Sequence, residues 1–270
     1  MSRIAQTFNA LKKQNKGAFI SYLEACDPDY NTSLALLKAM PEAGADLIEI
    51  GMPFSDPMAD GPVIQEAAKR SLKAGATMAK TLSLVRTFRQ ENTTTPLILM
   101  GYLNPVENYG VERFCHDAAQ AGVDGLIIVD VPPEEAAFLS EPAQKNGIDV
   151  IRLITPTSTD ERLEYITSQA SGFLYYVSIN GITGTRTAST EQLNAAFSRI
   201  RKKTDLPVVV GFGLSTPEHI RQALTVADGA VVASALIKTL ANSLDANHQA
   251  TEQTLPAVLS QLKTLADAKH

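Results

Sequence analysis

Residues 46–51 have the sequence DLIEIG, a short apolar run with one acidic side chain, Glu49, close to its end. Similar runs occur at 18–23 (AFISYL), 96–101 (PLILMG), 125–130 (GLIIVD), 148–154 (IDVIRLI), 172–178 (GFLYYVS), 207–211 (PVVVG) and 228–233 (DGAVVA). Continuous apolar runs are typical of parallel strands that are covered on both faces. We therefore predict eight parallel strands.

Segments with helical spacing of apolar residues separate these runs, as in residues 189–203. Eight strand–helix units in 270 residues predict an α/β fold, a single (β/α)8 TIM barrel. An open doubly wound sheet is the alternative, but the spacing of the strands is even and shows no internal break. The first 15 residues predict an extra N-terminal helix that caps the barrel bottom, so we expect residues 1–270 to form one domain.

The composition excludes several classes of protein. A formal net charge of −5 argues against a nucleic-acid partner. The two cysteines, Cys26 and Cys115, form no CxxC pair, which indicates a reducing compartment. No apolar run approaches the roughly 18 residues that would span a bilayer, and the polar start is unlike a signal peptide. We expect a cytoplasmic protein with no membrane partner.

Catalytic groups of a TIM barrel lie at the C-terminal ends of its strands. None of the 13 lysines is expected there, which argues against a Schiff-base aldolase. The 4 histidines fall in predicted helices or in the tail, so we expect no metal site. Carboxylates remain as the candidate catalytic groups.

Glu49 and Asp60 are the two candidate carboxylates. Strand alternation places Glu49 on the face opposite Ile48 and Ile50, toward either the barrel interior or the helices. A carboxylate in an apolar strand is costly unless it is paired, which favours a catalytic role; an ion pair with Arg152 is the alternative. Asp60 lies in the proline-stiffened loop after this strand, where a turn or capping role is equally open.

Two late turns form a candidate anion site. The seventh strand ends in Gly211-Phe212-Gly213, and the eighth ends in Ala233-Ser234 at a predicted helix start. Backbone N–H groups at such turns commonly bind phosphate in this fold, although the glycines could also serve only to make tight turns. The glycine-hinged segment 180–186 (NGITGTR) resembles a lid over a substrate.

Over essentially its whole length the chain resembles the tryptophan synthase alpha subunit family. The most specific block is residues 49–62 (EIGMPFSDPMADGP), and the segments around Tyr102-x-Asn104-Pro105, Asp130-Val-Pro132, Gly181-x-Thr-Gly184 and Gly211-Phe-Gly213 support it. Two positions depart from the family pattern. Ile179 stands where many relatives carry arginine, and Ala233 stands where glycine is usual.

The resemblance implies a lyase of tryptophan biosynthesis that cleaves indole-3-glycerol phosphate to indole and glyceraldehyde 3-phosphate without a cofactor. Glu49 would be the proton acid and base, and Asp60 would hydrogen-bond the indole N–H. The resemblance also implies contacts to the substrate and to its phosphate. The implied substrate-binding residues are Tyr22, Met100, Leu153, Tyr175 and Thr183, and the implied phosphate-binding residues are Gly184, Phe212, Gly213, Ala233 and Ser234.

The resemblance further implies a partner, a pyridoxal-phosphate β subunit, in a heterotetramer of two α and two β chains. The expected interface comprises loops 53–60, 102–109 and 131–136, with Pro53, Asp56, Asn104 and Pro132 in it. Two other functions compete. An indole-glycerol-phosphate synthase would need strand-end lysines, and a barrel that only binds a partner would have no need to keep Glu49 and Asp60.

Overall fold

The computed structural model describes residues 1–177, 190–211 and 213–269. Its strands are all parallel and form one sheet in the order β5-β4-β3-β2-β1-β9-β8-β7-β6. Their bounds are β1 (Ala18–Glu24), β2 (Leu47–Gly51), β3 (Leu97–Gly101), β4 (Gly125–Ile128), β5 (Asp149–Val150), β6 (Arg152–Ile154), β7 (Leu174–Val177), β8 (Val208–Gly211) and β9 (Gly229–Val232).

The predicted fifth strand, 148–154, is divided into β5 and β6. Its first half pairs with β4 and its second half with β7. Between the halves, the Ile151 N–H donates to the Leu126 carbonyl at 3.0 Å. The two ends of the sheet therefore meet at Ile151, and the barrel closes there. The prediction of one continuous strand was wrong because each half bonds to a different neighbour.

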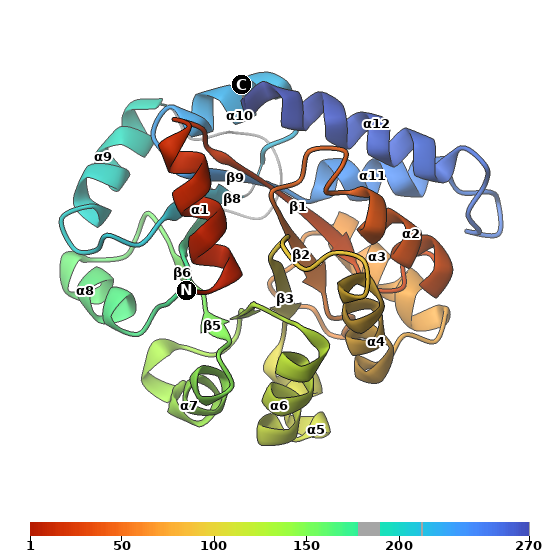
Figure 1. Cartoon of the computed structure of the whole chain (residues 1–270), viewed down its shortest axis with the longest axis horizontal. Helices are drawn as coiled ribbons and strands as arrows, with labels where there is room; N and C mark the ends of the chain where they lie inside the picture. Colours follow the sequence, from red (N-terminus) through yellow and green to blue (C-terminus); the bar gives the residue numbers. More distant parts are fainter. Residues whose placement is uncertain (178–189, 212, 270) are drawn as a thin grey trace.

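Helices surround the sheet on its outer side, except α1, which lies across one end of the barrel (Figure 1). They are α1 (Arg3–Lys13), α2 (Tyr30–Ala39), α3 (Pro62–Lys73), α4 (Met78–Arg89), α5 (Leu103–Tyr109), α6 (Val111–Ala121), α7 (Ala137–Lys145), α8 (Asp160–Ser168), α9 (Thr190–Ile200), α10 (Pro217–Leu224), α11 (Ser234–Ser243) and α12 (Thr254–Ala266), with short 3-10 helices η1 (Pro133–Glu135) and η2 (Asp267–Lys269). Segment 102–109 was expected as a loop, but all of it except Tyr102 forms α5. Pro105 fits its first turn, where backbone N–H groups have no intrahelical acceptor.

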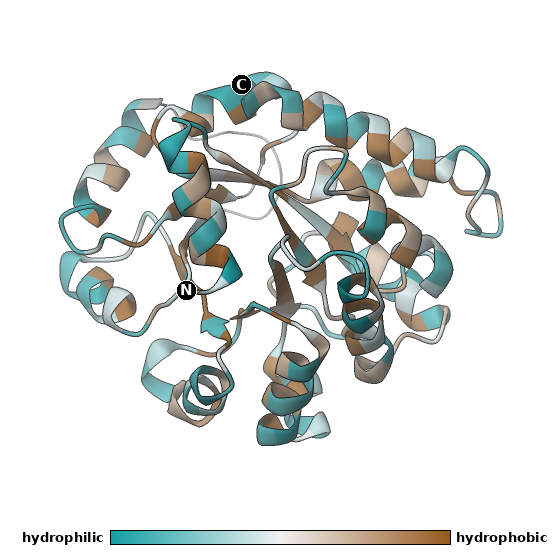
Figure 2. Cartoon of the chain, in the orientation of Figure 1, coloured by the Kyte–Doolittle hydropathy of each residue, from teal (hydrophilic) through white to brown (hydrophobic). Residues whose placement is uncertain are grey.

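Alternation along the strands divides the apolar side chains into two layers. Ile48 and Ile50 of β2 belong to the cluster between the strands and the helices. Leu47 belongs to the cluster inside the barrel, so Glu49, two residues on, also faces the interior. The strands are mostly apolar, whereas the outward helix faces are largely hydrophilic (Figure 2). Register thus directs Glu49 into the barrel.

Helix α1 precedes the first strand and packs at the N-terminal end of the barrel. Its buried residues Ile4, Phe8 and Leu11 join the interior cluster, and the Phe8 and Phe173 rings lie 5.7 Å apart. Arg3 forms a 2.8 Å ion pair with Asp124, directly before β4. Apolar burial and one ion pair therefore hold this helix to the strand starts.

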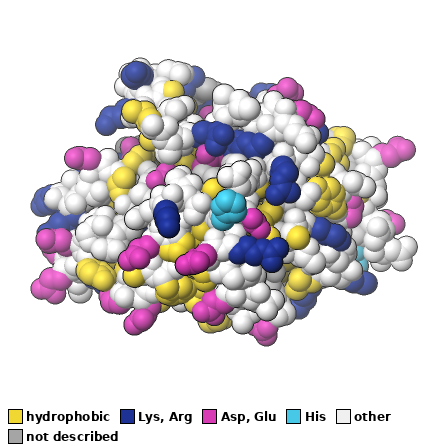
Figure 3. All heavy atoms as spheres, turned by 60° about the horizontal axis from the view of Figure 1, so that its bottom comes forward, with side chains coloured by type: hydrophobic (Ala, Val, Ile, Leu, Met, Phe, Trp, Pro, Cys, Tyr) yellow, Lys and Arg dark blue, Asp and Glu magenta, His cyan; other side chains and the backbone are white. Residues whose placement is uncertain are grey.

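The outer surface shows mixed charge. On the face shown in Figure 3, lysine and arginine side chains are interspersed with aspartate and glutamate. This face therefore offers no continuous basic stripe for a phosphate backbone. Among the described residues, no helix is both long and apolar enough to cross a membrane.

Candidate active site

Four of the substrate-binding residues that the family resemblance implies come together inside the barrel. Tyr22 lies near the end of β1, Met100 lies near the end of β3, and Leu153 and Tyr175 lie on β6 and β7. Tyr175 belongs to the interior cluster, and the side chains of Met100 and Leu153 pack against it. Tyr22 also contacts Met100, in a neighbouring cluster nearer the barrel mouth. These four side chains therefore surround the C-terminal half of the interior.

Glu49 lies among them without a polar partner. Its side chain is 1% exposed, and neither carboxyl oxygen has a hydrogen bond. Burial raises its pKa to about 8, so the carboxyl holds a proton at neutral pH.

The alternative ion pair between Glu49 and Arg152 does not form. Leu153 points into the interior, so the neighbouring Arg152 points toward the outer layer. There its Nη1 donates to the Val131 carbonyl at 3.4 Å. Glu49 is thus a buried acid without a counter-ion among the described residues.

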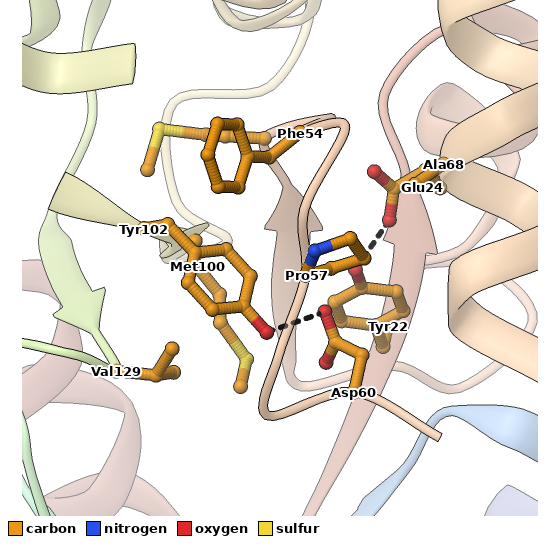
Figure 4. Close-up of a pocket in the computed structure, with 11 residues that line it drawn as sticks. Tyr22, Glu24, Phe54, Pro57, Asp60, Ala68, Met100, Tyr102 and Val129 are labelled. Carbon is orange, nitrogen blue, oxygen red and sulfur yellow. Dashed lines mark hydrogen bonds between the residues drawn. The ribbon is translucent and has the colours of Figure 1, made fainter. Parts of the chain in front are cut away.

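Asp60 lies on the loop after β2, beside the Tyr22 ring of β1 (Figure 4). Tyr102 Oη donates to Asp60 Oδ2 at 3.0 Å, and the Ala59 N–H donates to the same hydroxyl at 2.9 Å. Burial raises the pKa of Asp60, and the Tyr102 hydrogen bond lowers it. Tyr102 therefore fixes the loop and the orientation of this carboxyl.

Two tyrosines lie against glycines of neighbouring strands. A Cβ on Gly211 would lie 2.1 Å from Tyr175 Oη, and one on Gly51 would lie 2.0 Å from Tyr22 Oη. Burial is the main cause that raises the pKa of both tyrosines, and the charge of Glu49 raises it further. Both rings are therefore close enough to Glu49 to share its electrostatic environment.

Sequence reasoning missed Glu24 and gave Tyr102 no role. Both line the cavity with Asp60, Tyr22 and Met100. Glu24 falls one residue beyond the predicted strand 18–23, yet alternation with Tyr22 would have placed it inside. Tyr102 was noted only within a motif. Its hydroxyl bond to Asp60 depends on how the loop folds back, which no local pattern encodes.

The predicted phosphate turns lie at adjacent strand ends. Gly213 has φ +78, a conformation that favours glycine, and follows β8. Ala233 precedes α11, whose first turn begins at Ser234 and receives no side-chain cap. Its first backbone N–H groups are thus suited to an anion. Thr183, Gly184, Phe212, Ile179 and the lid segment 180–186 lie outside the described residues.

The predicted partner residues follow strand ends at the same end of the barrel. Asp56, Asn104 and Pro132 are exposed, and Pro53 is half-buried. Two exposed apolar side chains follow the same strand ends, namely Met58 (75% exposed) and Phe138 (43% exposed). The Leu103 N–H donates to Asp130 at 2.9 Å and ties two of these segments together.

Fold and site together define a class of protein: a (β/α)8-barrel enzyme with one buried carboxyl near the C-terminal end of β2 and another on the loop that follows it. All 13 lysines lie on helices or on segments that lead from a helix to the next strand, so no amine faces the site. The described residues contain no group of side chains suited to a metal ion.

The comparisons with known proteins specify the family. Residues 8–268 match the family model described as "Tryptophan synthase alpha chain". The chain is 63% identical to the tryptophan synthase alpha chain of Gluconacetobacter diazotrophicus (99% of this chain, 98% of the relative) and 60% identical to that of Gluconobacter oxydans (99% of each). The chain belongs to the tryptophan synthase alpha chain family.

Solved structures of tryptophan synthase agree with this family assignment. A tryptophan synthase subunit alpha from Legionella pneumophila superposes with a TM-score of 0.89 at 39% identity, covering 99% of this chain and 98% of that one. Tryptophan synthase from M. tuberculosis, in an aminoacrylate-bound form, gives a TM-score of 0.87 at 32% identity, with both chains fully covered. The predicted family and barrel are confirmed.

Family membership also settles the reaction class. Members of the family are lyases of tryptophan biosynthesis that cleave indole-3-glycerol phosphate. The α chain uses no cofactor of its own, and pyridoxal phosphate belongs to the β subunit.

Proposed function

We propose that Glu49 and Asp60 together perform the cleavage of indole-3-glycerol phosphate in this chain. The observation that carries the proposal is Glu49: a buried carboxyl, protonated at neutral pH and without a hydrogen-bond partner, at a strand end inside the barrel. A structural acid would be paired, because an unpartnered buried polar group costs stability. An acid that must give up and recover a proton needs this freedom.

The reaction then proceeds in two proton transfers. Glu49 gives its proton to C3 of the indole ring, which becomes a positively charged indolenine. Asp60, held by Tyr102, accepts a hydrogen bond from the ring N–H and stabilises that charge. The Glu49 carboxylate next takes the proton of the adjacent glycerol hydroxyl, the C–C bond breaks, and its electron pair returns the indole to aromaticity. Glu49 ends protonated, as it began.

The remaining roles concern binding. Tyr22, Met100 and Leu153 form the wall for the indole ring, and Tyr175 lies near the glycerol chain. The phosphate is held by backbone N–H groups and by the Ser234 hydroxyl. The residues that hold it are Gly184, Phe212, Gly213, Ala233 and Ser234. Thr183 is a further substrate contact, as the family resemblance implies. Lysine and arginine side chains take no part in this proposed anion site.

We further propose that the chain works in the cytoplasm and docks a β subunit over the barrel mouth, in an αββα assembly. Indole is apolar and escapes readily through membranes, so direct transfer to a partner avoids its loss. The rigid, proline-containing rim with exposed Met58 and Phe138 supports docking there, because a rigid surface loses little entropy on binding. Stiffening of long loops is the alternative role for these prolines.

The decisive experiment measures indole release from indole-3-glycerol phosphate by the purified chain, alone and with a tryptophan synthase β subunit. We expect cleavage by the isolated chain and faster cleavage in the complex. Absence of cleavage in both would overturn the proposed function. Cleavage with no acceleration would overturn only the role of the partner.

A further inference from the structure

Tyr22 and Glu24 form a buried pair at the end of β1. The two residues alternate with Ile20 and therefore point into the barrel. Tyr22 is 6% exposed and Glu24 is 3% exposed. Tyr22 Oη donates to Glu24 Oε2 at 2.5 Å, a short hydrogen bond. The bond joins two side chains of one strand across the mouth-facing end of the interior.

This pair occupies the space that Gly51 leaves empty on the neighbouring strand. A Cβ at Gly51 would lie 2.0 Å from Tyr22 Oη and 2.3 Å from Glu24 Oε2. The strands are in register, with Tyr22 opposite Glu49 and Glu24 opposite Gly51. The hydrogen bond therefore lies against the backbone of the strand that carries the proposed acid.

The charges around Glu24 do not explain its presence as an ion-pair partner. Arg70 of α3 is engaged by Asp27 through two hydrogen bonds of 2.8 Å. Burial is the largest influence and raises the pKa of Glu24 to about 8; the Tyr22 bond and Arg70 lower it, whereas Asp60 and Asp27 raise it. Glu24 thus stays at this position at an electrostatic cost, and its hydrogen bond is with Tyr22.

Glu24 also lines the cavity of the proposed site. Figure 4 shows the Tyr22–Glu24 bond beside Asp60 and Met100. The Tyr22 ring forms one wall of this cavity, and the proposed function places the indole against that wall. A shift of that ring would change the shape of the cavity, and the bond to Glu24 opposes such a shift.

We propose that Glu24 is a positioning residue for the cleavage reaction: its hydrogen bond fixes Tyr22 against Gly51 and so sets the shape of the indole end of the cavity. The inference rests on the proposed function, because it assumes that the indole packs against Tyr22. Glu24 touches no reacting atom in this account and acts through Tyr22. A residue that only stabilised the fold would affect unfolding rather than substrate binding.

The test is a double-mutant cycle, with kcat and KM for indole-3-glycerol phosphate measured on the chain in complex with a β subunit. Glu24→Leu removes the acceptor, and we expect KM to rise about tenfold with kcat nearly retained, since a buried hydroxyl loses its bond. Glu24→Gln should recover most of this loss, because its amide oxygen accepts the same bond. In a chain that already carries Tyr22→Phe, Glu24→Leu should raise KM by less than about a further twofold.

Tyr22→Phe alone removes the same bond from the other side and should raise KM similarly, which keeps the test valid if Glu24→Leu does not fold. The matched control is Asp46→Ala, which removes a carboxyl at the opposite end of β1 and β2, where it binds the Phe19 N–H and Lys269 at 2.8 and 2.7 Å. It should lower the unfolding temperature and leave KM unchanged.

Additive losses from Glu24→Leu and Tyr22→Phe would overturn the proposal, as would a loss confined to kcat or a Glu24→Gln variant as impaired as Glu24→Leu. Wild type and Glu49→Gln are measured in the same series. If wild type is active and Glu49→Gln is not, the proposed function stands whatever the outcome of the Glu24 cycle.

Discussion

Replacing Glu49 by glutamine should abolish cleavage and at the same time stabilise the fold. The side chain keeps its shape, but the amide cannot give a proton to the indole ring. An unfolded chain ionises this glutamate with a pKa near 4.5, whereas burial raises the pKa to about 8 in the fold. Between these values the folded state binds more protons than the unfolded state, so the stability of wild type falls as pH rises.

The size of this effect follows from the two pKa values. At about 1.36 kcal/mol per pKa unit, the 2.5-unit interval from 4.5 to pH 7 corresponds to about 3 kcal/mol of destabilisation. At pH 5 the same relation leaves less than about 1 kcal/mol. Glutamine does not titrate, so the stability gain of Glu49→Gln should grow from pH 5 to pH 7.

Urea unfolding followed by circular dichroism at both pH values measures this gain, and indole release measures activity. Glu42→Gln, at an exposed carboxyl, is the matched control and should show no comparable gain. Two results would refute the reasoning. One is a Glu49→Gln variant that keeps a tenth of the wild-type rate; the other is a stability difference that does not change between the two pH values.

Four further predictions concern the site. The kcat of wild type should fall as pH rises through about 8, since Glu49 then loses the proton it must donate; a flat profile between about pH 7 and 9.5 would contradict this. Asp60→Asn should lower indole release severely but leave a trace, because this group stabilises charge; complete retention would exclude the role. A sulfate or phosphate in a crystal should lie between Gly213 and Ser234, not between two basic side chains elsewhere. Pro132→Asp should weaken the complex with a β subunit in sedimentation at micromolar concentration, and an unaffected complex would place the docking face elsewhere.

The strands and the barrel were predictable because parallel strands that are covered on both faces appear in the sequence as continuous apolar runs. The division of 148–154 at Ile151 was not predictable, since it depends on which neighbour each half pairs with. The helical state of 103–109 was missed because Pro105 and Asn104 resemble loop residues, although the first turn of a helix tolerates proline.

The candidate site was predictable to a similar degree. Glu49 was identified because it lies within an apolar run near the C-terminal end of its strand, and alternation limited its side chain to two directions. Sequence could not choose between the interior and a pair with Arg152, because the choice depends on barrel closure. The sequence analysis gave Glu24 and Tyr102 no role because each acts through a contact with another side chain. The partners of these contacts, Tyr22 and Asp60, are defined only by the folded chain.

Helix α1 determines which end of the barrel is open to substrate and products. Because Ile4, Phe8 and Leu11 pack into its N-terminal end, the substrate and both proposed products use the C-terminal mouth. One product is an apolar ring and the other is a charged triose phosphate. A partner that covers the mouth to receive the ring must therefore leave an aqueous exit for the triose phosphate, and the order in which the two depart is decided at that shared opening.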